Sequence, residues 1–194
     1  MAAAAATTAT SSQSIGHFVK ALAAKQPTPG GGAAAAVGAA IGGAAASMSA
    51  AYTQRKKDAE SGAADKARAL ISKIGLDDLL RAADDDAEAY ANLQRTWKEA
   101  DTMDPAEKAT IEARALEVPT RLVESCHGYV VEISNFLLDC NPNITSDAKV
   151  GIHQLAGAAR AAYQTVLVNK PGDEERARLK TLLDEIRTIE DDLL

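Results

Sequence analysis

The chain has 194 residues, which is enough for one domain whose core buries about 70% of the surface of the unfolded chain. Its formal net charge of −6 argues against a protein that binds nucleic acid or an anionic membrane surface, because both need a basic footprint. Aromatic residues make up only 4% of the sequence, and Ala, Leu, Glu, Lys and Arg are frequent, so the composition favours an all-α fold.

Residues 1–13 form a low-complexity segment of Ala, Thr, Ser and Gln after the initial Met. Such a segment buries too little surface to compensate for its loss of conformational entropy, so we expect a mobile tail. It lacks the basic residues of a secretory or mitochondrial leader, which favours a cytoplasmic protein, although its composition also fits a plastid-type leader. The folded domain is expected to span residues 14–194 and to begin with a short helix after Ser14.

A glycine triplet, Gly30, Gly31 and Gly32, follows in the stretch Pro-Thr-Pro-Gly-Gly-Gly, and a run of Ala, Gly and Ser continues to residue 51. Thr28 is expected to cap a helix here, with Pro29 in its first turn. Glycines at a helix start allow a ligand or another backbone to approach the free N–H groups. The triplet is therefore a candidate binding site, and a purely structural turn is an equal alternative.

The Ala-rich run has no charged residue between Lys25 and Arg55, so a membrane-spanning helix must be considered. We expect no membrane span, because Ala and Gly contribute little transfer free energy. A phosphate-binding P-loop is excluded by the missing lysine and hydroxyl. The smallest residues recur every three or four positions and form a ridge with almost no side chains: Ala34, Gly38, Gly42, Ala45 and Ser49. We expect part of this ridge to lie in a homodimer interface.

The Ala-rich helix ends at a cationic segment, Gln54-Arg55-Lys56-Lys57. Cations stabilise a helix C-terminus electrostatically, and contact of this segment with an anionic ligand is the equal alternative. After a break at Ser61-Gly62 the sequence predicts a long helix over about 64–97, with a possible bend at Gly75.

One aspartate, Asp86, lies on the apolar face of that long helix. The face is formed by positions that step by three or four residues: Leu79, Ala83, Asp86, Tyr90, Leu93 and Trp97. Burial, together with repulsion from Asp84, Asp85 and Glu88, is expected to raise the pKa of Asp86. A carboxyl that keeps its proton near neutral pH is suited to general acid catalysis. The structural alternative is an aspartate that caps a neighbouring helix or pairs with a lysine or arginine.

Three further helices are expected in the second half of the chain. Asp104-Pro105 begins one that runs to Leu137 and is expected to kink or restart at Pro119. Thr145-Ser146-Asp147 is expected to cap the next, which ends at Asn169, and the last covers 173–194. Capping is the most common role for polar groups such as Asn143 and Asp147. The sequence thus predicts an all-α, single-domain bundle of about six helices.

The cysteines and histidines give no sign of a metal site. Cys126 and Cys140 are too few for a disulfide framework, which fits a reducing compartment. The three histidines are scattered along the chain, so we expect no bound metal and no tightly bound cofactor.

Three stretches, in this order and at these distances, resemble the cyclodeaminase/cyclohydrolase family of folate one-carbon metabolism. They are the glycine turn with its Ala-rich helix, the acidic motif Asp84-Asp85-Asp86-Ala87-Glu88-Ala89-Tyr90, and Asn143-Ile144-Thr145-Ser146-Asp147 with the helix that ends at Asn169. The family includes the C-terminal domain of formimidoyltransferase-cyclodeaminase and free-standing methenyltetrahydrofolate cyclohydrolases. The likeness covers essentially Ser14 to Leu194.

The resemblance implies an all-helical subunit that dimerises and binds a tetrahydrofolate derivative as its substrate. The implied reaction is closure of formimidoyltetrahydrofolate to methenyltetrahydrofolate with loss of ammonia, or interconversion of methenyl- and formyltetrahydrofolate by water. The catalytic aspartate of the family corresponds to Asp86. The implied substrate contacts are Gly30, Gly31, Gly32, Lys56, Asn143, Asp147 and Asn169.

Two positions depart from the family pattern. Thr165 stands where the family usually has an asparagine, and Arg55 stands near the basic pair where a glycine is usual. Both changes bear on the contacts to the pterin ring. Since this sequence carries no formimidoyltransferase domain, the hydrolytic activity or a separate role is favoured. Two alternatives remain open, namely a scaffold that acts on a different iminium or cyclic amine and a non-catalytic interaction protein.

Overall fold

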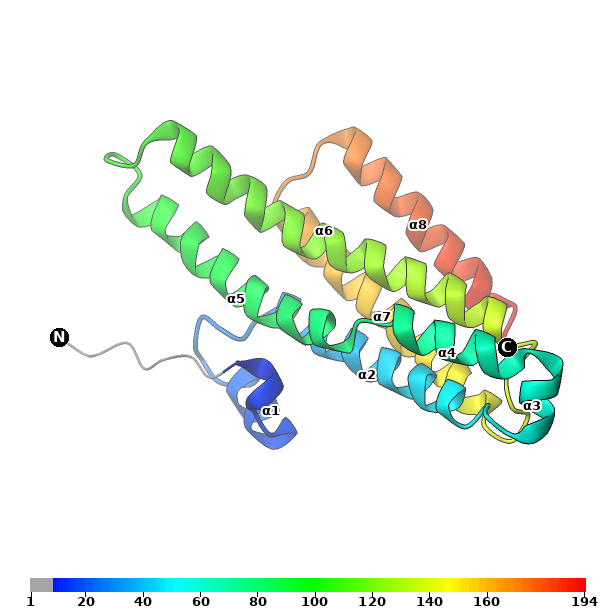
Figure 1. The fold of residues 1–194 in the computed structure, drawn as a ribbon. Coiled ribbons are helices and arrows are strands. Elements are labelled where there is room, and N and C mark those ends of the chain that lie inside the picture. Colours follow the sequence, from blue (N-terminus) through cyan, green and yellow to red (C-terminus); the bar gives the residue numbers. More distant parts are fainter. Residues whose placement is uncertain (1–8) are drawn as a thin grey trace.

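The computed structural model describes residues 9–194, and this part of the chain is an all-α bundle (Figure 1). A 3₁₀ turn, η1 (Thr10–Ser12), precedes the α-helices. In chain order these are α1 (Ile15–Leu22), α2 (Gly31–Ala51), α3 (Lys56–Ser61), α4 (Ala63–Lys73), α5 (Leu76–Lys98), α6 (Pro105–Phe136), α7 (Thr145–Val168) and α8 (Asp173–Asp191). The predicted fold class is confirmed.

Two glycines explain why the described part has eight α-helices where about six were expected. Gly62 has φ +81° and ends α3 as α4 begins, a left-handed conformation that glycine adopts without strain. Gly75 has ψ 79° and separates α4 from α5, so the expected bend of the 64–97 helix is a complete break.

The central contact of the bundle joins α2 to α7. A Cβ on Gly42 would lie 3.0 Å from the carbonyl oxygen of Gly151, and one on Gly151 would lie 2.8 Å from that of Gly42. Glycine at both positions therefore lets the two backbones touch. This part of the predicted small-residue ridge is covered by α7 of the same subunit, and the exposed face of α2 carries Ile41, Met48 and Tyr52 instead.

The largest fully buried side chains come from α6, α7 and α8, whereas α2 contributes mainly Ala and Gly. By length and composition α2 could cross a membrane, but 56% of its most apolar window is buried inside the protein, as in the central helix of a bundle. The fully buried aliphatic residues are Val123, Val130, Ile133, Ile152, Leu155, Val166, Leu179 and Ile186.

The predicted helix starts are correct for α6 and wrong for α2 and α7. Asp104 accepts hydrogen bonds from the N–H groups of Ala106 and Glu107, as expected for an N-cap. The N-cap of α2 is Gly30, two residues after Thr28, and the N-cap of α7 is Ile144, which has no capping side chain.

Arg55 joins two turns at one end of the bundle. Its guanidinium donates to both carboxylate oxygens of Asp58 at 2.7 Å and to Asn141 Oδ1 at 2.6 Å. Asn141 Nδ2 in turn donates to the Tyr52 carbonyl at 3.0 Å. The departure from the family pattern at Arg55 therefore has a structural role, because it ties the α2–α3 turn to the α6–α7 turn.

The N-terminal segment is held against α5. The backbone N–H and the hydroxyl of Thr10 both donate to Asp84 Oδ1, at 2.9 and 2.6 Å. Residues 10–12 of the expected mobile tail are thus attached to the domain. Residues 1–8 of that expected tail lie outside the described part.

Candidate functional site

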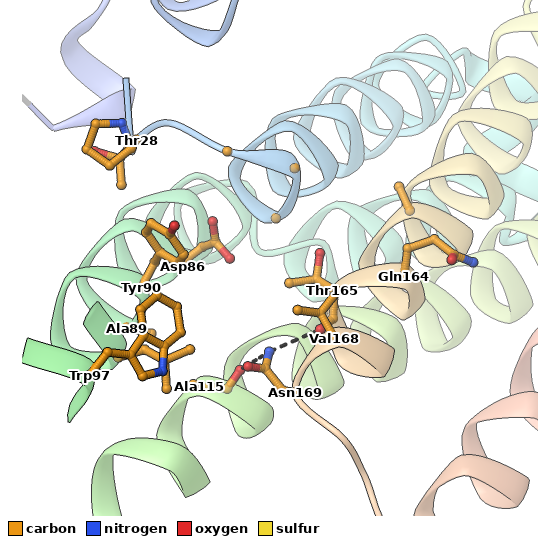
Figure 2. A pocket seen from close by; sticks show the side chains of 16 residues that line it. Thr28, Asp86, Ala89, Tyr90, Trp97, Ala115, Gln164, Thr165, Val168 and Asn169 are labelled. Atoms are coloured by element: carbon orange, nitrogen blue, oxygen red, sulfur yellow. Dashed lines mark hydrogen bonds between the residues drawn. The ribbon is translucent and has the colours of Figure 1, made fainter. Parts of the chain in front are cut away.

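A cavity of about 640 Å³ lies where α2 begins and α7 ends, beside the α5–α6 hairpin that extends past the rest of the bundle (Figures 1 and 2). Its volume is in the range of small-molecule sites. One wall comes from α5, the second from the glycine turn, and the third from the last turns of α7, with Ala115 contributed by α6.

Asp86 projects into this cavity from α5 (Figure 2). Its Oδ2 accepts a hydrogen bond of 3.0 Å from the N–H of Ala33, in the first turn of α2. That N–H has no acceptor within its own helix, so Asp86 acts as a capping group supplied by another helix. The sequence analysis gave helix capping by Asp86 as the alternative to a catalytic role. In the structure Asp86 caps α2 and also faces a cavity.

Gly32 makes this approach possible. A Cβ on Gly32 would lie 1.9 Å from Asp86 Oδ1, whereas a Cβ on Gly30 or Gly31 would meet nothing within 4 Å. Within the glycine triplet, therefore, only Gly32 must lack a side chain to allow the close contact with the Asp86 carboxylate.

Burial is the main cause that raises the pKa of Asp86, and the hydrogen bond from Ala33 opposes it. Repulsion from neighbouring carboxylates, which we expected from the sequence, is not a cause. Asp84 is hydrogen-bonded to Thr10, and Asp85 lies 3.4 Å from Arg114. Among residues 9–194, no lysine or arginine pairs with Asp86. The carboxyl is thus half-buried without a balancing cation.

Asn169 lines the cavity at the end of α7, with its side-chain amide fixed by two backbone carbonyls. Its Nδ2 donates to Ala115 and to Thr165, each at 3.0 Å (Figure 2). The Ala115 carbonyl is available because Pro119, four residues later in α6, has no N–H to offer it. Both donor hydrogens of the amide are used, which leaves its oxygen as the group that can accept from a ligand.

The sequence family follows from a comparison with family models. The model described as formiminotransferase-cyclodeaminase matches residues 14–188. The chain belongs to this family. The resemblance inferred from the three sequence stretches is confirmed.

Among solved structures, formiminotetrahydrofolate cyclodeaminase from Thermotoga maritima is similar to this family member. The two sequences are 22% identical, with a TM-score of 0.72 over 94% of this chain and 92% of that chain. This likeness shows that the fold is shared. A comparison with curated proteins found no match.

Three of the binding residues implied by the family resemblance lie at the other end of the bundle. Lys56 begins α3, its side chain is 92% exposed, and Asn143 and Asp147 lie at the start of α7. The 24 residues of α7 separate its two ends by about 35 Å. The structure therefore brings Asp86, the glycine triplet and Asn169 together and leaves these three apart from them.

Sequence reasoning missed part of the cavity wall. Tyr90, Leu93 and Trp97 line the cavity, although their spacing was interpreted as a helix-packing face. The available signal was their position four, seven and eleven residues after Asp86, on the same side of α5. Gln164 and Thr165 of α7 also line the cavity. Within the described residues, no three His, Cys, Asp or Glu side chains are grouped so that they could hold a metal.

Proposed function

We propose that this family member is an enzyme of folate one-carbon chemistry, a methenyltetrahydrofolate cyclohydrolase or a formimidoyltetrahydrofolate cyclodeaminase, without a tightly bound cofactor. The observation that carries the proposal is the Asp86 carboxyl, which faces a cavity of ligand size with no basic partner among the described residues. Family membership supplies the substrate class.

Both reactions pass through a tetrahedral carbon bonded to N5, to N10 and to a third atom, which is the amino nitrogen in the cyclodeaminase reaction and oxygen in the cyclohydrolase reaction. In the cyclodeaminase reaction, N10 attacks the formimidoyl carbon and the amino group leaves as ammonia once it is protonated. In the cyclohydrolase reaction, water adds to the methenyl carbon and one carbon–nitrogen bond breaks after protonation of that nitrogen. A neutral Asp86 carboxyl supplies the proton, and its carboxylate takes one up in the reverse direction.

The surroundings of Asp86 suit both of these states. Burial favours the neutral acid, while the Ala33 N–H and the N-terminus of α2 favour the carboxylate. Because these effects oppose each other, neither state is excluded, as a group that donates and then accepts a proton requires.

We also propose that the protein works as a homodimer through α2. Ile41, Met48 and Tyr52 are exposed along one face of this helix, which carries no charged residue. At its N-terminal end, α2 reaches the cavity, which is lined by Gly30, Gly31 and Gly32. If the α2 helices of two subunits pack antiparallel about a two-fold axis, the α3 end of one subunit comes to the cavity of the other. The partner would then supply Lys56, Asn143 and Asp147.

The absorbance of methenyltetrahydrofolate tests the enzymatic proposal. The protein should accelerate its decay, and Asp86→Asn should abolish the acceleration. A parallel assay with formimidoyltetrahydrofolate should release ammonia if the cyclodeaminase reaction is the correct one. If neither substrate reacts or binds at micromolar concentration, the folate proposal is wrong.

A second candidate keeps the fold and changes the substrate. Thr165 lines the cavity at a position where the family usually has asparagine, so the contact surface offered to a ligand differs there. In this case Asp86 would move a proton on another iminium or cyclic amine. Turnover of such a compound, without folate binding, would support this candidate.

A further inference from the structure

We infer that Tyr90 and Trp97 form the surface on which the p-aminobenzoyl ring of the substrate lies, and that Trp97 determines how tightly folates bind. This inference rests on the proposed folate-dependent function, because it assumes that the one-carbon unit is placed at Asp86.

The two aromatic residues continue the face of α5 that carries Asp86. Tyr90 lies one turn beyond Asp86 and Trp97 three turns beyond it, which places them about 6 and about 16 Å further along the helix axis. Both line the cavity, and Figure 2 shows them on the same side of it as Asp86, with Val168 on the opposite helix. A ligand that touches Asp86 and extends along α5 therefore meets Tyr90 first and Trp97 next.

The two aromatic rings contact each other, yet they are poorly covered by the rest of the protein. The ring centroids of Tyr90 and Trp97 lie 6.3 Å apart at an interplanar angle of 79°, a favourable edge-to-face arrangement. Trp97 is nevertheless 60% exposed, and Val168 is also exposed. Apolar surface that faces a cavity from two helices is typical of a ligand site rather than of a helix-packing face.

The chemistry of this wall fits the p-aminobenzoyl ring better than the pterin ring. A pterin carries several donors and acceptors on its edges, and these would remain unpaired against Ala89, Leu93 and the ring faces. The Ala33 N–H is bound to Asp86, but the N–H groups of Gly31 and Gly32 in the same turn of α2 have no acceptor within the helix and offer the pterin a polar environment on the other side of Asp86. A p-aminobenzoyl ring has apolar faces and C–H edges, which suits stacking on aromatic side chains.

Trp97 is the only tryptophan in the chain, so its fluorescence reports on this site alone. We would titrate the wild-type protein with folinic acid, with p-aminobenzoylglutamate and with 6-methyltetrahydropterin, using free tryptophan to correct for absorption by the ligands. Folinic acid and p-aminobenzoylglutamate should quench the fluorescence, and the pterin should not.

Calorimetry on variants measures the contribution of the ring. Trp97→Ala should weaken folinic acid binding about tenfold and raise KM by a similar factor, with kcat changed less than about twofold. Trp97→Phe should retain most of the affinity, since a flat aromatic side chain remains. Leu138→Ala is the matched control, because Leu138 is a highly exposed apolar residue that does not line the cavity.

The outcomes separate this inference from the proposed function. Unchanged folinic acid affinity in Trp97→Ala would overturn the inference and leave the folate function intact. Quenching by the pterin but not by p-aminobenzoylglutamate would overturn the assignment of the ring. Failure of folinic acid to bind the wild-type protein would overturn both proposals.

Discussion

Pro119 and Asn169 act on the same atom, the carbonyl oxygen of Ala115. Pro119 leaves this oxygen without its helical partner, and Asn169 Nδ2 binds it at 3.0 Å. A proline inside α6 is thereby compensated by a side chain from the end of α7, and the same bond fixes an amide in the wall of the cavity. The helix does not restart at Pro119, since α6 is continuous from Pro105 to Phe136.

Asn169→Ala should destabilise the protein by about 1–3 kcal/mol, because the carbonyl of the buried residue Ala115 loses its partner. Urea unfolding measures this change. In the background of Pro119→Ala, the new N–H at position 119 bonds the Ala115 carbonyl, so Asn169→Ala should then have a smaller effect. Equal effects in both backgrounds would contradict the compensation between the two residues.

Gly32→Ala should reduce kcat/KM by about 100-fold or more, because its Cβ would occupy the position of Asp86 Oδ1 and displace the proposed general acid. Gly128→Ala is the control. It lies within α6, and its Cβ would meet nothing within 4 Å. This variant should keep full activity and gain up to about 1 kcal/mol of stability. An active Gly32→Ala protein would show that the carboxylate does not need its present position.

The contribution of Asp86 to the stability of the folded protein should fall as pH rises through the raised pKa of this carboxyl. Between the unfolded and folded pKa values, the folded state binds more protons than the unfolded state, so unfolding becomes easier with increasing pH. Asp86→Asn removes the buried charge and should therefore raise the melting temperature at pH 7 while abolishing activity. This gain should shrink toward pH 4, where the unfolded carboxyl also becomes protonated. A gain that does not depend on pH would contradict the raised pKa.

The titration of Asp86 should also appear in the pH dependence of kcat/KM. If the neutral form of Asp86 donates the proton, kcat/KM should fall with slope −1 on the alkaline side of its pKa. Comparison of this pKa with the stability transition provides an internal check, because both measurements report the same carboxyl in the free enzyme. Two clearly different values would show that another group limits the reaction.

Met48→Glu should convert the proposed dimer into a monomer, because it places a charge in the middle of the exposed face of α2. Sedimentation velocity measures the change. Ile71→Glu, on a partly exposed position of α4, is a control that should leave the assembly unchanged. A wild-type protein that sediments as a monomer would exclude the dimer.

Mixing two inactive variants tests whether the partner supplies Lys56. Asp86→Asn and Lys56→Ala should each be inactive alone. After exchange of subunits, the mixed dimer has one site with both residues, so the mixture should recover roughly a quarter of wild-type activity. No recovery after confirmed exchange would place Lys56 outside the site or in the same subunit as Asp86.

Short-range patterns predicted most of the fold, and long-range contacts explain the errors. Apolar periodicity identified the long helices, and Asp104-Pro105 marked the start of α6, because both signals act within a few residues. The predicted start of α2 was wrong because the side chain that caps this helix, Asp86, lies 53 residues after Ala33, the residue that it binds. A local rule selected Thr28 and had no means to detect a carboxylate brought in by α5.

The candidate site, too, was predictable from the sequence only in part. Asp86 stands out in the sequence because it is charged on an apolar face, and the cavity contains it. Tyr90, Leu93 and Trp97 do not stand out, because residues that pack against a helix and residues that line a cavity follow the same spacing. The separation of Lys56, Asn143 and Asp147 from the cavity depends on the direction of α2 and α7, which no motif encodes.

The N–H of Ala33 couples the acidity of Asp86 to the position of an entire helix. Sliding α2 along its axis by one residue, about 1.5 Å, would break this bond and strengthen proton binding by the carboxyl. If contact with a second subunit holds α2 in this position, association should release protons from Asp86, and acidification should weaken that contact by the same linkage. In the proposed dimer, the strength of subunit association and the proton affinity of Asp86 would thus both depend on the position of α2.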